Sequence, residues 1–459
     1  MAAEKRMTIK ELPKSTRLAM VSQFLGFGLD AYDMGLVLVM APILTKLFAP
    51  PKGDPAWEYI SIVFLYSITM AARPVGAAFF GHFADKTGRR FLLVLTIAGV
   101  GLMSFASAFL PTQATAGVWA YALFSVLRFF MGCFFGGEYA VGHTFAIEHA
   151  PRERRGAIGG FVQSGFPLGF VLASCVFALV SRSIGEQAML DYGWRIVFAS
   201  GVVPVFLALY IRRILPESPE FEKAKESGAI EKAPFFSLFR PPALWSFLQV
   251  FFFMTGLFLT DYAVYGFLPK ILTGAGKFDT STYALIYGFA LLMAFIGYNL
   301  YGWSSDYVGR KKLTLWYCAF LVIFGVPVYY VLHEAVVAHN VALALIGATM
   351  AAMLKLGWGI VPAYLSERFP THQRSVGVGF GYSAGALIGG AGISVFVWWA
   401  HSIPFIKNIE GNDLWLSPSV ILTVGAVMTF ASLLFSPETK DLELSEVEAV
   451  TREKERAAA

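Results

Sequence analysis

Seven ionisable side chains stand inside long apolar stretches of this sequence, where charge is rare. A charged group at the centre of a lipid bilayer costs at least about 2.5 to 3.5 kcal/mol on insertion scales, so it is normally paired, placed in a water-filled cavity, or functional. Carboxylates in such places can bind protons, and basic groups can bind anions. The seven are Asp30, Asp33, Arg73, Arg128, Glu138, Asp261 and Lys355.

The acidic groups near the N-terminus are candidates for proton binding. Asp30 and Asp33 are three residues apart and share a helix face, so the two carboxylates can couple and one of them can hold a proton. Helix rise places Asp33 between the levels of Glu138 and Arg128 in another apolar stretch. We therefore predict a proton-coupling group of Asp30, Asp33, Arg128 and Glu138. A fixed structural ion pair between Asp33 and Arg128 is the alternative.

Other polar side chains are candidates for binding a solute. Lys355 lies so deep that it requires an anion, and a substrate carboxylate is the partner we favour. Asp261 as an internal counter-ion and snorkelling toward the surface are the alternatives. The amides of Gln163, Gln249 and Asn299 can orient a polar solute, although each can equally join two helices. We predict that these five residues bind substrate.

The composition indicates that membrane helices hold these groups. Of 459 residues, 56% are hydrophobic and 15% charged, against about 25% charged in a soluble domain. One membrane span needs about 20 apolar residues. The net charge of +5 is too modest to indicate nucleic-acid binding, and the three cysteines lie in apolar runs. Twelve apolar segments are long enough to span: 18–48, 57–83, 89–110, 117–148, 154–181, 194–214, 243–272, 280–303, 312–332, 338–366, 374–402 and 414–435.

The basic residues predict an orientation. Most of the 36 Lys and Arg lie at the two termini or after even-numbered segments, and basic residues near span ends stay on the cytoplasmic side. Both termini of this multi-pass protein are therefore predicted to be cytoplasmic, with the chain in the cytoplasmic membrane. The predicted parts are an N-terminal segment 1–17, a six-helix half 18–214, a linker 215–242, a second six-helix half 243–435 and a tail 436–459.

An internal repeat supports the division into halves. The stretch 81–90, GHFADKTGRR, aligns without a gap with 302–311, GWSSDYVGRK, and the stretches 148–155 and 367–374 share the spacing of Glu, Pro and Arg. An Asp followed by basic residues can bridge helix ends by charge-assisted hydrogen bonds, although the basic residues also satisfy the positive-inside rule alone. We predict a cytoplasmic gate formed by Asp85, Gly88, Arg89, Arg90, Glu148, Arg155, Asp306, Gly309, Arg310, Glu367 and Arg374.

The pattern G-x-x-x-D-x-x-G-R-R/K after the second segment resembles the signature of the major facilitator superfamily, and the resemblance covers essentially the whole chain. It implies an all-α integral membrane protein with twelve transmembrane helices in two six-helix halves. Parallel repeats of this kind place a binding site between the halves, near the bilayer midplane.

Shorter motifs resemble particular branches of that family. RPVG at 73–76, EHAP at 148–151 and LDAYD at 29–33 are similar to those of proton-coupled organic-acid symporters, for metabolites, sialate and aromatic acids. Gln163, PESP at 216–219 and PETK at 437–440 resemble sugar porters instead. The seventh segment departs from the sugar-porter pattern, because Gln249 stands alone where that pattern has paired glutamines.

We predict a secondary transporter that moves a small organic anion, such as a monocarboxylate, together with protons. The alternatives are a proton-coupled sugar or polyol porter, a proton-driven exporter, and a membrane sensor that does not transport. The sequence has no P-loop and no H-E-x-x-H motif, so we expect no enzyme, metal or cofactor, with the proton gradient as energy source. The expected partners are a small-molecule substrate, protons and the lipid bilayer, without nucleic acid, and the protein is expected to be monomeric.

Overall fold

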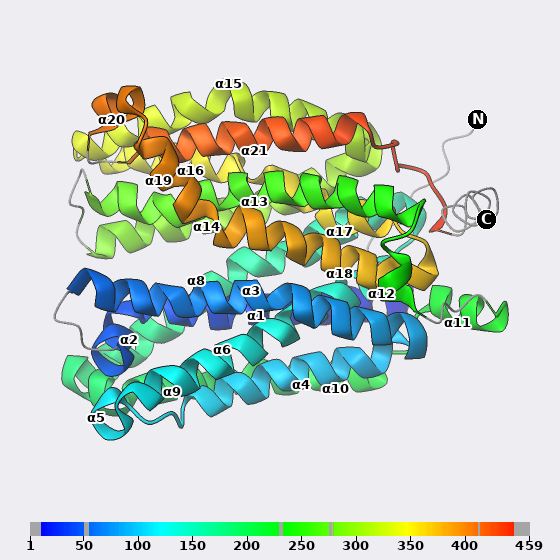
Figure 1. Ribbon diagram of the computed structural model, residues 1–459, viewed down its shortest axis with the longest axis horizontal. Helices are drawn as coiled ribbons and strands as arrows, with labels where there is room; N and C mark the ends of the chain where they lie inside the picture. The colour runs from blue at the N-terminus through cyan, green and yellow to red at the C-terminus, as the bar shows by residue number, and fades with distance from the viewer. Residues whose placement is uncertain are drawn as a thin grey trace.

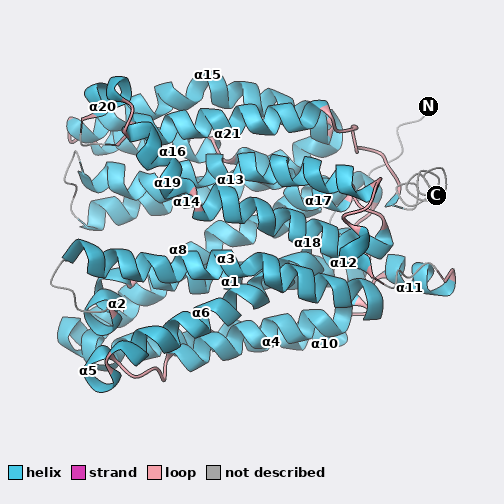
Figure 2. Ribbon diagram, viewed as in Figure 1, coloured by secondary structure: helices cyan, strands magenta, loops and turns pink. Residues whose placement is uncertain are grey.

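The computed structural model describes residues 11–49, 55–228, 233–274, 278, 280–411 and 414–444. Across this part of the chain, Figure 2 shows helices and loops only. The predicted all-α membrane fold is confirmed, because every apolar segment predicted from the sequence is occupied by helix. The ends of the predicted N-terminal segment and tail, residues 1–10 and 445–459, lie outside the described residues, as does 229–232 of the linker.

The first six-helix half precedes the linker. Apolar segments become helices in lipid because each backbone N–H and C=O must find its partner inside the segment. Short π or 3-10 turns (labelled η) and breaks divide some spans in two. The elements are α1 (Lys14–Val39), α2 (Ala41–Phe48), α3 (Pro55–Thr87), α4 (Arg89–Ser107), α5 (Gln113–Ala116), α6 (Val118–Glu138), η1 (Tyr139–His143), α7 (Thr144–Glu148), η2 (Arg152–Arg154), α8 (Arg155–Ala188), η3 (Met189–Gly193), α9 (Trp194–Ser200) and α10 (Val202–Ile214).

The linker carries two short helices, and the second six-helix half follows it. By length and hydropathy, nine helical stretches in the described part of the chain could each cross a membrane, and one of them, Arg152–Ser200, covers the predicted span 154–181 and the start of the next, 194–214. The elements are α11 (Pro219–Glu226), α12 (Pro234–Ser237), α13 (Ala243–Gly274), α14 (Thr280–Val308), α15 (Arg310–Val337), α16 (Val341–Met353), η4 (Leu356–Ile360), α17 (Val361–Ser366), η5 (Thr371–Gln373), α18 (Arg374–Gly385), η6 (Ala386–Ala391), α19 (Ile393–His401), α20 (Pro404–Glu410) and α21 (Leu416–Leu434).

The two halves lie side by side, with the helices of each packed on one another. In Figure 1 the helices α1 to α10 fill the lower part of the view and α13 to α21 the upper part. The halves meet where α8 packs on α14 and where α3 packs on α18. We call the end of the bundle that carries α11 and α12 the α11 end, and the end that carries α2, α5 and α20 the α20 end (Figure 1).

Glycines bring α3 and α6 unusually close together. A Cβ added at Gly76 would lie 1.8 Å from the carbonyl oxygen of Cys133, and one at Gly136 would lie 2.0 Å from that of Arg73. Small residues let membrane helices approach until their backbones touch. The contact fixes α3, with Arg73, against α6, with Arg128.

Regular α-helix breaks at equivalent places in the two halves. After α6 the chain passes through the π-helical turn η1, which begins at Tyr139, and after α16 it passes through the 3-10 turn η4, which contains Trp358. These two aromatic residues are 219 residues apart, the same offset as between Glu148 and Glu367. Such local departures from the α-helix are frequent at functional sites, and both lie where the halves face each other.

Candidate functional site

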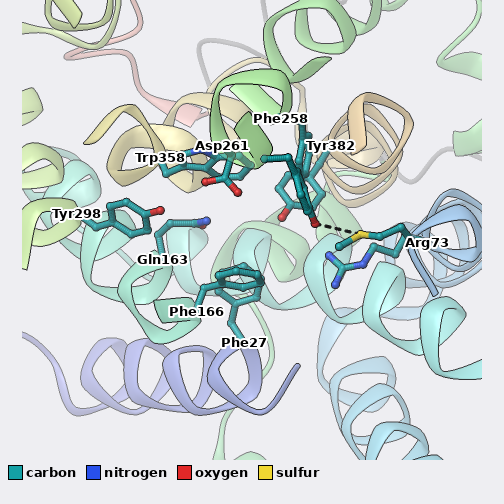
Figure 3. A pocket seen from close by; sticks show the side chains of 11 residues that line it. Phe27, Arg73, Gln163, Phe166, Phe258, Asp261, Tyr298, Trp358 and Tyr382 are labelled. Atoms are coloured by element: carbon teal, nitrogen blue, oxygen red, sulfur yellow. Dashed lines mark hydrogen bonds between the residues drawn. The ribbon is translucent and has the colours of Figure 1, made fainter. Parts of the chain in front are cut away.

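A narrow cavity lies between the two halves (Figure 3). The free space around its lining residues is about 300 Å³, a figure that includes space open to solvent. Both halves contribute to it, as the sequence repeat predicts. The lining residues are Phe27, Met70, Arg73, Gln163 and Phe166 from the first half, and Phe258, Asp261, Tyr262, Tyr298, Trp358 and Tyr382 from the second.

Aromatic rings form most of the cavity wall. Tyr139 stacks on Tyr382 across the two halves, with ring centroids 3.4 Å apart, and Trp358 meets the same Tyr382 edge-on at 6.1 Å. Phe27 and Phe166 pack together at 5.3 Å on the opposite wall (Figure 3). These surfaces suit a small solute with an apolar body, and their π faces can also accept a cation.

Arg73 brings an unpaired positive charge to the cavity. Its side chain is buried, its Nη2 lies 2.8 Å from the Sδ of Met34, and its guanidinium carbon lies 5.3 Å from the ring of Phe135. In the part of the chain that the structure describes, no carboxylate forms an ion pair with it. The sequence alone gave Arg73 no role beyond a buried charge, although its motif RPVG was the available signal. The cavity therefore has a cationic group ready for an anion.

Lys355 pairs with Asp261 instead of facing the cavity. Its Nζ contacts Oδ1 of Asp261, and of the two residues only Asp261 lines the cavity. The Lys355 side chain is 0% exposed, against 10% for Asp261, so the ammonium does not snorkel to a surface. Of the partners weighed from the sequence, the structure gives Lys355 the internal counter-ion Asp261.

Asp33 and Arg128 form a buried ion pair inside the first half. Nη1 of Arg128 donates to Oδ2 of Asp33 at 2.6 Å, and Nη2 donates to the hydroxyl of Ser107 at 3.1 Å. Both charged side chains are 1% exposed. The two residues meet as helix rise predicts.

Glu138 has a partner that the sequence did not reveal. Arg212 approaches both of its carboxylate oxygens, one of them at 2.9 Å, and Thr96 donates to it at 2.8 Å. Nε of Arg212 also donates to the hydroxyl of Ser22 at 3.2 Å. From the sequence, Arg212 counts among the basic residues that flank the linker, but the structure buries it. Its position inside the apolar segment 194–214 was the signal.

Asp30 is the exception among the predicted proton-coupling residues. It is 1% exposed, and neither of its carboxylate oxygens has a hydrogen-bond donor. In the described part of the chain no basic residue forms an ion pair with Asp30, because Arg128 is paired with Asp33 and Arg212 with Glu138. Of the four predicted residues, Asp33 and Arg128 thus pair with each other and Glu138 pairs with Arg212. Asp30 is the one carboxylate of the four without an ion pair.

Only one of the three predicted amides reaches the cavity. Gln163 lines it and points into it (Figure 3). Nε2 of Gln249 donates to the carbonyl of Ser432 at 3.4 Å, which joins α13 to α21, and Nδ2 of Asn299 donates to the carbonyl of Phe295 in its own helix at 2.8 Å. Neither of these two lines the cavity. Gln249 therefore joins two helices, which was the alternative weighed from the sequence, and Asn299 bonds within its own helix.

The predicted gate ties the halves together at the α11 end. Asp85, near the end of α3, accepts hydrogen bonds from the backbone N–H groups of Ser375 at 3.1 Å and Val376 at 2.9 Å, in the first turn of α18. A carboxylate is favourable at a helix N-terminus. Arg89 lies 3.2 Å from Asp85 and 3.1 Å from Glu148, so one guanidinium bridges two spans of the first half.

The second half repeats this arrangement toward the first. Asp306 accepts from the backbone N–H groups of Gly156 at 2.8 Å and Ala157 at 2.9 Å, at the start of α8. Arg310 lies 2.9 Å from Asp306 and 3.2 Å from Glu367. Each half therefore caps a helix of the other with an aspartate.

The two gate glycines sit at sharp turns. Gly88 and Gly309 have φ of 109° and 105°, a conformation that other residues rarely adopt. Each glycine is the single residue between two helices, α3 and α4 at Gly88 and α14 and α15 at Gly309. Beside it, Arg90 donates to the backbone carbonyl of Arg213 at 2.5 Å, so the gate also holds the end of α10.

Two further acidic residues belong to the gate and were missed. Glu217 accepts from the backbone N–H groups of Arg89 and Arg90 at 3.0 and 3.1 Å, and Glu438 takes the equivalent place at Arg310, at 2.7 Å. From the sequence, the motifs PESP and PETK counted only as a resemblance to sugar porters. Their offset of 221 residues, shared with the Asp-containing loops, was the signal.

One cross-half ion pair of the predicted gate has no counterpart, among the described residues, on the symmetry-related side. Oε1 of Glu148 forms an ion pair with Nη1 of Arg374, from the second half, at 2.8 Å. The equivalent Arg155 forms no such pair in the described chain and donates to the carbonyl of Leu442 at 2.7 Å. Burial raises the pKa of the Glu367 carboxyl, while Arg310, Thr439 and Arg155 act in the opposite direction. A backbone carbonyl of the tail thus binds Arg155, whereas the equivalent Arg374 binds the carboxylate of Glu148.

Comparison with known proteins agrees with this architecture. The family model described as Major Facilitator Superfamily matches residues 23–393. A metabolite transport protein of Haemophilus influenzae is 30% identical over 442 residues, covering 94% of this chain and 96% of its own. The ectoine/proline transporter ProP of Corynebacterium glutamicum is 29% identical over 463 residues, covering 95% and 88%. A structure of the proton:xylose symporter XylE covers 95% of this chain and 99% of its own, with a TM-score of 0.77 at 20% identity, which shows a shared fold.

Proposed function

The chain belongs to the Major Facilitator Superfamily, and we propose that it is a symporter that carries a small organic carboxylate together with a proton. It is a multi-pass membrane transporter and not an enzyme. We propose that the proton gradient supplies the energy without a cofactor and that the protein works as a monomer, since residues from both halves of one chain line the cavity.

The observation that carries the proposal is the unpaired guanidinium of Arg73 at the cavity. A buried cation without a counter-ion is costly, and a carboxylate that enters the cavity can supply one through charge-assisted hydrogen bonds. Gln163 adds an amide, and the aromatic walls fit an apolar or planar body. The narrow cavity limits the size of the substrate.

The α11 end is proposed to face the cytoplasm, as the basic residues predict. Aspartate caps, ion pairs and the tail tie the two halves together at that end. With this proposed orientation, the closed α11 end corresponds to a state that is closed toward the cytoplasm. Alternating access requires these contacts to break when the cavity opens toward the cytoplasm.

A second candidate substrate is a zwitterion, and Asp261 favours it. This carboxylate faces the cavity from the second half, while Arg73 faces it from the first (Figure 3). A substrate with a carboxylate at one end and a cation at the other could meet both, its cation resting on aromatic faces. The name of ProP agrees with such a substrate. A sugar is less well supported, because Gln249 and Asn299 lie outside the cavity.

Uptake into proteoliposomes tests the proposal. Purified protein would be reconstituted, an inward proton gradient imposed, and accumulation measured for lactate, succinate, benzoate, sialate, proline, betaine and a hexose. We expect accumulation of a carboxylate, abolished by a protonophore. Uptake of the hexose alone would contradict the organic-acid proposal, and accumulation that ignores the proton gradient would contradict symport.

A further inference from the structure

Two consecutive residues of α1 contact two different arginines. Asp33 accepts from Nη1 of Arg128 on α6 at 2.6 Å, and Nη2 of Arg73 on α3 donates to Sδ of Met34 at 2.8 Å. Consecutive side chains of an α-helix point about 100° apart, because one turn takes about 3.6 residues. One arginine is thereby given a carboxylate and the other a thioether, so α1 neutralises Arg128 and leaves the charge of Arg73 in place.

The sulfur of Met34 is the one hydrogen-bond acceptor that the Arg73 side chain reaches among the described residues. Nε of Arg73 has no acceptor, and the guanidinium carbon lies 5.3 Å from the ring of Phe135. Asp30 lies one turn before Met34 on α1, yet neither of its carboxylate oxygens accepts a hydrogen bond. The guanidinium is therefore held by a sulfur and an aromatic ring, both of which are neutral.

The position of this sulfur is fixed by packing. Met34 is buried, and the next residue, Gly35, lies so close to α8 that an added Cβ would be 2.9 Å from the Cβ of Ala173. The contact holds α1 against α8 at the level of Met34. The Arg73 side chain, which lines the cavity (Figure 3), is therefore anchored to a rigid part of the first half.

A thioether differs from the other side chains that could occupy this position. It is polarisable and a weak acceptor, so it orients a guanidinium without supplying a charge. A carboxylate here would form an ion pair with Arg73 and compete with an entering anion. An aliphatic side chain would leave the guanidinium without an acceptor to orient it.

We propose that Met34 is a positioning residue for substrate binding and makes the cavity selective for anions, because its sulfur holds the Arg73 guanidinium at the cavity without neutralising it. The inference rests on the proposed function and adds to it the residue that keeps the cation available. Arg73 contacts the substrate carboxylate, and Met34 acts only through Arg73.

Three substitutions at Met34 separate these effects. Met34→Leu keeps a similar volume but removes the acceptor, Met34→Gln supplies a neutral acceptor, and Met34→Glu supplies a negative charge. Met40→Leu is the matched control, because Met40 is buried at the end of the same helix and its sulfur accepts no hydrogen bond within the described residues.

Uptake of lactate, succinate and benzoate into proteoliposomes gives KM and the maximal rate of each variant. For a carboxylate that the wild type carries, Met34→Leu should raise KM by about two- to tenfold, the effect of one neutral hydrogen bond, with little change in maximal rate. Met34→Gln should restore KM toward the wild-type value. Met34→Glu should raise KM by roughly ten- to a hundredfold, because an internal ion pair replaces the one with the substrate.

The control decides whether these changes reflect the contact with Arg73 or packing in general. Met40→Leu should leave KM unchanged. An unchanged KM in Met34→Glu would overturn the proposal, and so would an equal rise in Met34→Leu and Met34→Gln. The same rise in Met40→Leu as in Met34→Leu would also overturn it, since loss of a buried sulfur alone would then explain the effect.

A measurement without substrate tests the contact itself. Infrared difference spectra of the purified protein, between the wild type and Met34→Glu, should contain guanidinium bands, because an ion pair changes the vibrations of an arginine. The same comparison in the Arg73→Gln background should lack these bands. Bands that persist there, or that are missing from the first comparison, would overturn the role of Met34. If the wild type takes up none of the three carboxylates, the proposed function fails, and the spectra still decide whether Met34 holds Arg73.

Discussion

Glu148 of the first half and Arg374 of the second are joined by an ion pair of 2.8 Å, whereas the equivalent Arg155 and Glu367 are not. The closed α11 end therefore depends more on one side of the pseudo-symmetric gate than on the other. A charge-assisted hydrogen bond contributes about 1.5 to 3 kcal/mol, and about 1.4 kcal/mol is a tenfold change in an equilibrium.

Arg374→Ala should shift the protein toward the state open at the α11 end by roughly tenfold or more, because it removes the only direct cross-half ion pair of Glu148. Arg155→Ala should have a smaller effect, since it removes a bond to the tail. Labelling of a cysteine introduced at the cavity, from the α11 side of oriented vesicles, measures the shift. Equal labelling in both variants would contradict the asymmetry.

Arg73→Gln should weaken binding of a carboxylate by roughly ten- to a hundredfold, since a bond to a charged group contributes about 1.5 to 3 kcal/mol. Arg73→Lys should retain part of the affinity, because it keeps the charge but loses the planar fork. Affinities for the transported carboxylate would be compared with those of the wild type. Unchanged affinity in Arg73→Gln would remove Arg73 from the substrate site.

Lys355→Gln should impair transport by leaving Asp261 as an unpaired buried charge, and Asp261→Asn should do the same to Lys355. The double variant should recover much of the lost function, because it leaves neither charge behind. Uptake rates and thermal stability of the three variants form a double-mutant cycle. Additive losses would indicate that Lys355 acts on the substrate independently of Asp261.

Gln163→Ala should raise the substrate concentration needed for half-maximal uptake, because Gln163 is the only one of the three predicted amides that lines the cavity. Gln249→Ala should affect stability more than affinity, since its side chain joins α13 to α21. Uptake kinetics and melting temperature separate the two effects. The same loss of affinity in both variants would show that Gln249 also reaches the substrate.

Gly76→Ala should destabilise the protein by about 1 to 3 kcal/mol, the usual cost of overpacking, because its Cβ would collide with the carbonyl of Cys133. Gly266→Ala in α13 is the control, since a Cβ there meets nothing within 4 Å. Alanine should stabilise that helix by up to about 1 kcal/mol. Thermal unfolding in detergent measures both, and a stable Gly76→Ala would mean that α3 and α6 can separate.

The sequence by itself determined the fold and located the residues of the predicted gate. Hydropathy defines membrane helices because lipid forces each span to satisfy its own backbone. The repeated Asp, Gly and Arg positions located the gate because duplicated halves meet the same partners: Asp85 caps α18, and Asp306 caps α8. Glu217 and Glu438 are related by the same offset as these loops, but they were not recognised from the sequence as equivalent.

Only the tertiary structure decided how the buried charges pair. Asp33 and Arg128 could be matched by depth, because each lies inside one continuous helix, α1 and α6. Depth did not separate the two partners of Lys355, because rotation of a helix about its axis decides whether a side chain faces a neighbour, the cavity or lipid. Arg212 was missed because the sequence places it next to the linker, where basic residues are expected. That rotation is set by packing such as the contact of Gly76 with α6, which distant parts of the chain create together. The isolation of Asp30 and Arg73 follows from the same packing, and no local pattern in the sequence contains it.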